Sequence, residues 1–292
     1  MPDFQNATLD GMTTGFCSDR PWNFALDAMW ETYGLTNAAD AYLLLTRSGY
    51  AIPDAEDSEL RAWLREVAAA VNSSLHAWTK WADLHPTSSS FERYRSDNHL
   101  SWALIGLLGA GIALDDPALV SYVLEGGTWD DGRSGPYANP SHFRDVVDRA
   151  IEGNGRLYEE RILRDPPIGY ALFHLFPLAL VARAAEANLG RSLQEVEGTD
   201  GGGLEESFRR YAPYVTGAAT SPRPDQEGAQ TGYAWLFAIA RQWWPDATGI
   251  AEAAALGPAD RMIVQAIGPV DLLAQGMSAA ATTVPAPVLE VE

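Results

Sequence analysis

The residues best suited to chemistry lie in a polar stretch from Arg93 to Trp102. Within it, Asn98 and His99 stand where a polar segment meets a long apolar one, so we expect them in the first turn of a helix. Backbone N–H groups and the positive end of the helix dipole favour an anion there. An ordinary cap fits equally, with Asp97 or Asn98 accepting hydrogen bonds from free N–H groups. The stretch alone predicts either an anion site or a helix cap.

A second such stretch runs from Glu160 to His174. Two consecutive prolines predict an extended approach, because proline restricts its own backbone and that of the preceding residue. Arg164 and Tyr170 would then lie on either side of a rigid elbow that leads into an apolar helix. A guanidinium and a phenol beside a cavity suit chemistry on a sugar that carries a carboxylate. Alternatively, Arg164 forms an ion pair with Asp165 and Tyr170 is a core tyrosine.

Helical periodicity extends over nearly the whole chain, and strand-like alternation is nearly absent. The segment from Asp57 to Asp83 is amphipathic, whereas His99–Leu114 and Tyr170–Val181 are apolar on nearly all sides, which indicates buried inner helices. Glycines within His99–Leu114 predict close helix packing. We expect turns at Gly34 and at several later Gly, Asp and Pro clusters. The other predicted helices span Pro21–Tyr33, Ala38–Thr46, Ser141–Ile151, Leu172–Ala187, Leu204–Tyr214 and Thr231–Trp243.

Inner and outer helices that alternate along a chain are typical of an (α/α) toroid or barrel of antiparallel helical hairpins. We therefore expect an all-α fold, with residues 1–277 as one domain and residues 278–292 as a flexible tail without periodicity. A helical-repeat solenoid is the alternative, although no repeat of fixed length is visible. The long loop from Gly126 to Pro140 suggests a functional segment.

Composition argues against several classes of protein. The chain has 20 Lys and Arg against 39 Asp and Glu, a formal net charge of −19, which disfavours nucleic-acid binding. The single Cys17 allows no intramolecular disulfide, and no cluster has metal-ligand spacing, so we expect neither metal nor cofactor. No apolar run reaches the roughly 20 residues of a membrane span. No secretory signal is visible, which predicts a cytoplasmic protein unless a leader has been removed.

The two polar stretches together resemble the alginate lyase superfamily of polysaccharide lyases. The segment from Asp97 to Trp102 looks like the family's Asn-Asn-His-x-x-Trp motif at the head of an inner helix. The segment from Arg164 to Leu175 looks like its Arg-x5-Tyr-x-x-Phe-Asn-Leu motif. Weaker matches at Gly15–Ala28 and Gly201–Tyr214 keep the family order. The resemblance implies an (α/α) toroid and β-elimination on a uronate polysaccharide such as alginate, polymannuronate or glucuronan.

The resemblance also implies a role for each matched residue. A charged carboxylate activates the neighbouring C5 proton poorly, so Asn98 would neutralise it, assisted by His99 and Arg164. Tyr170 would protonate the leaving oxygen. The base would be Tyr170 in a syn elimination or His99 in an anti elimination. Four further residues would bind the sugar, one of them by stacking: Arg20, Trp102, Arg161 and His174.

This chain departs from the family pattern in three ways. Asp97 replaces an Asn and adds negative charge beside the carboxylate to be neutralised, and His174 replaces the Asn that follows Tyr-x-x-Phe. The portion that precedes the early Asp-x-Arg helix is missing, so we expect an incomplete toroid with a more open cleft. Pairing into a homo-oligomer would cover such a cleft.

Two other functions stay open. A glycoside hydrolase of the same architecture would need two carboxylates in the cleft, for which Asp130, Asp131, Glu159 and Glu160 are available. A carbohydrate-binding protein could retain the toroid without turnover. Unsaturated products would exclude the first alternative, and retained oligosaccharide binding without turnover would identify the second.

Overall fold

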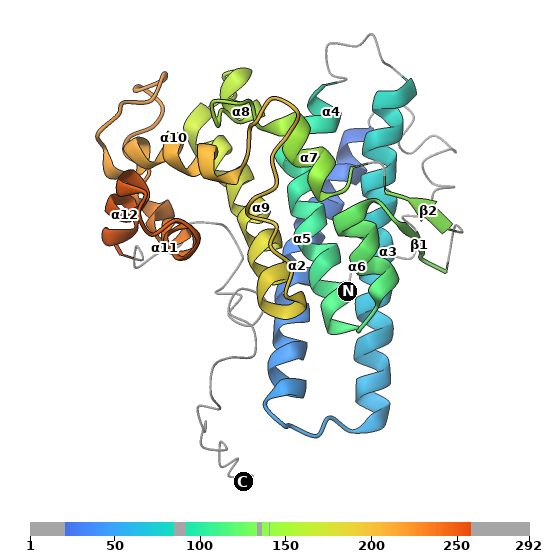
Figure 1. The fold of residues 1–292 in the computed structure, drawn as a ribbon. Coiled ribbons are helices and arrows are strands. Elements are labelled where there is room, and N and C mark those ends of the chain that lie inside the picture. Colours follow the sequence, from blue (N-terminus) through green and yellow to red (C-terminus); the bar gives the residue numbers. More distant parts are fainter. Residues whose placement is uncertain (1–20, 85–91, 133–135, 140, 258–292) are drawn as a thin grey trace.

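The computed structural model describes residues 21–84, 92–132, 136–139 and 141–257. They form an all-α fold in which helices pack on helices in a toroid-like arrangement (Figure 1), as the alternation of inner and outer helices predicted. Cys17, Arg20 and the predicted tail, residues 278–292, lie outside these ranges.

The innermost helix is α5 (Asn98–Ala113), in which every residue is buried. It packs against α2 (Pro21–Arg47), α3 (Asp54–Leu84) and α9 (Pro167–Leu189). A Cβ on Gly106 would lie 2.8 Å from the Thr32 side chain, so the absence of a side chain there lets α2 and α5 approach closely. The close packing predicted from the glycines is confirmed.

Helix α2 corrects one prediction, because it runs unbroken where we expected a turn at Gly34. Tyr33 and Leu35 are buried on either side of the glycine. A glycine in a helix interior costs about 1 kcal/mol relative to alanine, whereas burying one large apolar side chain contributes about 1.5–3 kcal/mol. Burial of its neighbours therefore outweighs the helix-breaking tendency of Gly34.

Several short elements were not predicted. Helix α6 (Pro117–Glu125) follows directly on α5, and Asp116 caps it by accepting hydrogen bonds from two backbone N–H groups. One of the turns expected at Gly, Asp and Pro clusters lies here, between α5 and α6, and Pro117 begins the new helix. Within the long Gly/Asp/Pro loop, β1 (Thr128–Asp130) pairs antiparallel with β2 (Pro136–Ala138), which corrects the expectation of an irregular segment.

The remaining helices complete the two sides of the molecule. Helices α10, α11 and α12 pack together on the opposite side of α9 from α5 (Figure 1). The bounds are α4 (Arg93–Ser96), α7 (Phe143–Ala150), α8 (Tyr158–Arg161), α10 (Leu204–Thr216), the 3-10 helix η2 (Thr231–Tyr233), α11 (Ala234–Trp243) and α12 (Thr248–Ala255).

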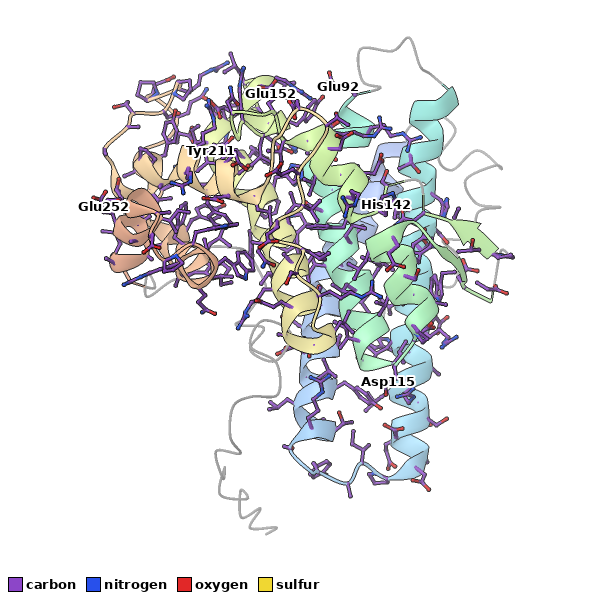
Figure 2. All side chains as sticks on the ribbon, viewed as in Figure 1. Glu92, Asp115, His142, Glu152, Tyr211 and Glu252 are labelled. Atoms are coloured by element: carbon purple, nitrogen blue, oxygen red, sulfur yellow. The ribbon has the colours of Figure 1, made fainter. Side chains whose placement is uncertain are left out.

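Helix α9 is the second inner helix. It is long and apolar enough to cross a membrane by length and composition, and 78% of its most apolar window is buried inside the protein. Helices α5 and α9 both begin at the upper end in Figure 1, beside α4 and α8. Glu92 and Glu152 mark that end among the side chains drawn in Figure 2. The first turns of the two inner helices therefore lie at the same end of the fold.

Candidate active site

Asp97 is the N-cap of α5, so the cap interpretation of this stretch is confirmed. It has an extended backbone, and its Oδ1 accepts a hydrogen bond from the backbone N–H of His99 at 3.1 Å. Its other oxygen, Oδ2, lies 2.8 Å from His99 Nδ1. Asp97 is fully buried and His99 is 6% exposed. One carboxylate therefore binds both the backbone and the ring of the same histidine.

A second buried carboxylate, Glu159 of α8, joins the beginning of α5 to α9. Its Oε1 accepts a hydrogen bond from the backbone N–H of Asn98 at 2.8 Å, and its Oε2 lies 2.8 Å from His174 Nδ1. Glu159 and His174 are both fully buried. No pattern in the sequence indicated this contact, which depends on how α8 packs against the two inner helices.

Replacing Glu159 with Ala should lower the free energy of unfolding. The change leaves the Asn98 N–H and the His174 ring without their shared acceptor, and each buried unsatisfied group costs about 1–3 kcal/mol. We expect a total loss of about 3 kcal/mol, measured by urea unfolding. The exposed Glu195→Ala variant should stay within about 0.5 kcal/mol of wild type. Equal stability of the two variants would contradict the role assigned to Glu159.

The side-chain amide of Asn98 is oriented by Arg164. Arg164 Nη1 donates a hydrogen bond to Asn98 Oδ1 at 2.6 Å, which identifies the opposite atom of the amide as the Nδ2 donor. Asn98 is only 1% exposed, and within the described part of the chain Nδ2 has no hydrogen-bond partner. A buried donor without a partner is costly, and it is satisfied when an acceptor binds.

A left-handed turn brings Arg164 back toward α5. Leu163 has φ +51°, a conformation that costs a non-glycine residue about 1–2 kcal/mol. Backbone hydrogen bonds hold the turn, from Leu163 N to Glu160 O at 3.0 Å and from Arg164 N to Glu159 O at 2.9 Å. Backbone strain of this kind persists where surrounding contacts fix it, often at functional sites.

The Arg164 guanidinium also stacks over the ring of Tyr170, 3.9 Å from its centroid. Of the two predicted interpretations of Arg164, the structure favours the elbow over an ion pair with Asp165. Pro166, the N-cap of α9, is extended as the proline pair predicted. Tyr170 follows in the first turn of the helix and is partly buried, with its ring under the guanidinium.

The segment before α11 is tied to the beginning of α9. Glu227 accepts hydrogen bonds from Ile168 N at 2.9 Å and Gly169 N at 2.8 Å, and Ser221 donates a third to it. Tyr233 donates a longer bond to the Gly169 carbonyl at 3.4 Å. These contacts satisfy the free N–H groups of α9 and hold Tyr233 close to the candidate site.

Two tyrosines near Tyr170 should make the protein less stable at alkaline pH. Burial raises the pKa of Tyr33, helped by the nearby Tyr233 and Tyr170, and burial together with the Glu227 charge raises the pKa of Tyr233. The folded state holds these protons more tightly than the unfolded state. The associated stability is therefore complete below the unfolded pKa of about 10 and is lost as pH rises beyond it.

The measurement is the urea midpoint between about pH 9 and pH 11.5. Tyr233→Phe should flatten the alkaline decline. The exposed Tyr50→Phe variant is the matched control and should decline like wild type. A wild-type midpoint that does not fall above pH 10 would be inconsistent with this account.

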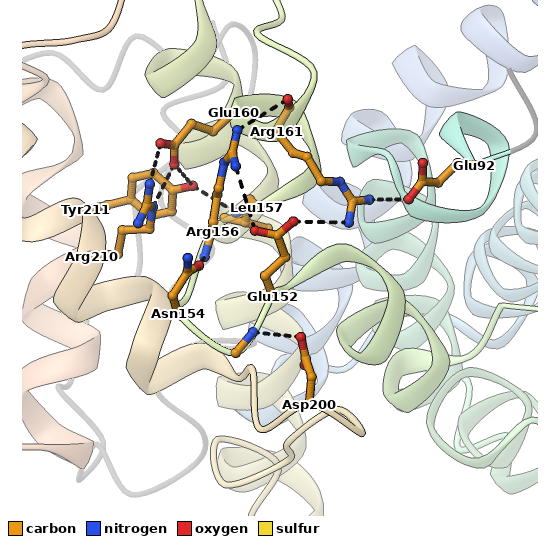
Figure 3. A network of polar contacts seen from close by, with 11 residues as sticks. Glu92, Glu152, Asn154, Arg156, Leu157, Glu160, Arg161, Asp200, Arg210 and Tyr211 are labelled. Carbon is orange, nitrogen blue, oxygen red and sulfur yellow. Dashed lines mark hydrogen bonds and ion pairs between the residues drawn. The ribbon is translucent and has the colours of Figure 1, made fainter. Parts of the chain in front are cut away.

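Arg161, a predicted sugar contact, is engaged by protein carboxylates. Its guanidinium pairs with Glu92 at 2.7 Å and with Glu152 at 3.5 Å (Figure 3). It also lies over the Tyr158 ring. The next network in the same view joins Glu160 to the partners Arg210 and Tyr211. Arg161 therefore braces α8 against the segment before α4.

Trp102 and His174 do not reach the surface as sugar contacts would require. Trp102 is 0% exposed, and its indole packs against Tyr33, Phe173 and Phe176 with ring centroids 4.6, 5.0 and 5.2 Å away. His174 is fully buried on Glu159. Because protein atoms cover both side chains, they pack beneath the candidate site and do not line it. The structure brings together Asn98, His99, Arg164 and Tyr170.

A cavity of about 410 Å³ lies at the same end of the fold, lined by Glu92, Arg95, Ser96 and Arg149. Ser96 immediately precedes Asp97, so the cavity adjoins the beginning of α5. Among the residues whose placement is described, no three His, Cys, Asp or Glu side chains come together as metal ligands. The chemistry available here is that of an amide, an imidazole, a guanidinium and a phenol.

Comparison with known protein families gives a match. The model of the alginate lyase family matches residues 23–221, more than half of the chain. The matched range includes both inner helices and all four clustered side chains. No curated protein matches the chain.

Proposed function

The chain belongs to the alginate lyase family, and on that premise we propose that it cleaves a uronate polysaccharide by β-elimination. The substrate would be alginate, polymannuronate or glucuronan. The observation that carries the proposal is the amide of Asn98, whose oxygen is bound by Arg164 and whose buried nitrogen has no partner within the described ranges. This nitrogen is a donor already oriented for an acceptor, and a uronate carboxylate oxygen is such an acceptor.

Neutralising the carboxylate is the main requirement of the reaction. Removing the C5 proton places a second negative charge on a group that already carries one. Donors fixed in a site of low dielectric stabilise that charge without reorganising. The Asn98 amide would supply one donor, and the Arg164 guanidinium beside it would supply positive charge.

Tyr170 would complete the elimination. A base, Tyr170 itself in a syn elimination or His99 in an anti elimination, would take the C5 proton. The C5–H electron pair then forms the C4=C5 double bond, and the C4–O bond breaks toward the leaving sugar. The phenol proton of Tyr170 is transferred to that oxygen. Arg164, 3.9 Å from the ring centroid, would stabilise the resulting phenolate.

Two of the four carboxylates suggested for a hydrolase, Glu159 and Glu160, are poorly suited to that role. Both oxygens of Glu159 accept hydrogen bonds from protein groups in a fully buried position. Glu160 is bound by Arg210 and Tyr211. A general acid and a general base of a glycosidase both need access to the scissile bond. These contacts support a lyase over a hydrolase.

The cavity next to α5 supports a polymeric substrate. Arg95 and Arg149 line it together with Glu92, and Arg149 also pairs with Asp145 at 3.1 Å, so two guanidinium groups lie at this cavity although the chain as a whole is strongly acidic. The charges that line a site determine how a charged ligand binds there, whereas the net charge of the protein acts mainly on the rate of association. The second uronate of a chain bound at Asn98 would extend into this cavity.

The test is the ultraviolet absorbance of unsaturated uronate formed from polymannuronate, polyguluronate, glucuronan and a glycosaminoglycan. We expect absorbance to rise on at least one of the first three polymers. If absorbance rises on none of the polymers while oligosaccharides still bind, the lyase proposal is wrong and the chain is a carbohydrate-binding protein.

A further inference from the structure

We propose that Asp97 is a positioning residue that holds His99 as the neutral tautomer protonated on Nδ1, which makes Nε2 the atom that accepts the C5 proton. The inference rests on the proposed function and deepens it by assigning the base. Tyr170 then acts only as the acid.

The geometry restrains the imidazole at two points. Asp97 Oδ1 binds the backbone N–H of His99, and Oδ2 lies 2.8 Å from Nδ1 of the same residue. A carboxylate can only accept a hydrogen bond, so Nδ1 must carry a proton. In a neutral ring the acceptor is then Nε2. The Asn-Asn-His-x-x-Trp motif has an Asn at position 97. Its NH2 group could donate to Nδ1 and so favour the tautomer that is protonated on Nε2.

The surroundings of Asp97 favour a negative charge on its carboxylate. The positive end of the α5 dipole stabilises a negative charge at the N-cap of the helix. Arg164 adds a permanent positive charge one residue away, at the Asn98 amide. Asp97 therefore orients His99 before the reaction and stabilises the imidazolium that forms during it, as the aspartate does in serine-protease triads.

The proton balance closes with two separate groups. Nε2 of His99 takes the C5 proton and becomes imidazolium, while Tyr170 gives its proton to the leaving oxygen and becomes phenolate. The imidazolium then releases its proton to solvent, and the phenolate regains one. His99 is 6% exposed, so substrate binding must uncover the Nε2 edge of the ring, as loop movements do in many enzymes.

The test compares Asp97→Asn with Asp116→Asn. Asp116 is a matched control because it also caps a helix, α6, and accepts hydrogen bonds from Ala118 and Leu119. Asn caps helices about as well as Asp, so both variants should fold. Asp97→Asn should lower kcat about 100-fold with a smaller change in KM, whereas Asp116→Asn should keep wild-type kcat. Wild-type kcat in Asp97→Asn would overturn the proposal.

Nitrogen-15 NMR of the imidazoles gives a second readout that needs no substrate. The protein has five histidines, so selective labelling gives a simple spectrum in which a His99 variant assigns the resonance. We expect Nδ1–H for His99 in wild type and Nε2–H in Asp97→Asn, with His174 unchanged in both. An Nε2–H ring or an imidazolium in wild type would overturn the proposal. A wild-type protein without lyase activity but with the Nδ1–H ring would contradict the proposed function while keeping the contact.

Discussion

Replacing Tyr170 with Phe is expected to lower kcat about 10⁴-fold, at the upper end of what one general acid contributes. The substitution removes only the hydroxyl. The ring that Arg164 covers at 3.9 Å stays in place, as does its edge contact with Phe173. The expected loss is therefore in turnover, with the free energy of unfolding nearly unchanged.

The measurement is the initial rate of unsaturated product on the best polymer, together with urea unfolding of the same protein. Tyr214→Phe is the control, because Tyr214 is a partly buried tyrosine on α10 that stacks on Tyr211. It should turn over like wild type. A Tyr170→Phe protein with wild-type kcat would remove Tyr170 from the mechanism.

Replacing Asn98 with Asp is expected to lower kcat/KM about 10³-fold, as removal of one oriented donor does in oxyanion sites. Asp has the shape of Asn and can still accept the hydrogen bond from Arg164. It replaces the buried NH2 donor by an oxygen and adds a negative charge that repels the substrate carboxylate. The fold is retained, and only the group proposed to face the carboxylate changes.

Asn188→Asp is a closely matched control. Asn188 Oδ1 accepts a hydrogen bond from Arg47 Nη1 at 2.6 Å, the same kind of contact at the same length, near the far end of α9. We expect its kcat/KM to equal that of wild type in the same absorbance assay. Equal rates for Asn98→Asp and Asn188→Asp would show that the Asn98 amide does not bind the reacting group.

Periodicity was sufficient to predict the long helices, but not the short ones or every boundary. The inner helices α5 and α9 were visible because apolar residues on every side need burial on every side. Gly34 does not end its helix, because local propensity is weak beside the burial of Tyr33 and Leu35. Helix α6 was missed because its 9 residues are too few for a helical period to stand out.

The site was predictable to the extent that its residues lie in two ordered motifs. The contact between the two motifs was not predictable, because Asn98 and Arg164 are 66 residues apart and their contact depends on a left-handed turn at Leu163. Asp97 looked unfavourable in the sequence, since its charge would oppose a bound carboxylate. In the structure that charge is directed at His99. Trp102 could have faced a sugar or the core, and only packing distinguishes these.

The most direct test of the central claim is mass spectrometry of the products formed in water enriched in ¹⁸O. β-Elimination breaks the C4–O bond without adding water, so we predict an unsaturated non-reducing end and no ¹⁸O gained by cleavage. Product masses are corrected for exchange at the reducing end with an uncut oligosaccharide. Saturated products that gain one ¹⁸O per cleavage would identify a hydrolase and contradict the account.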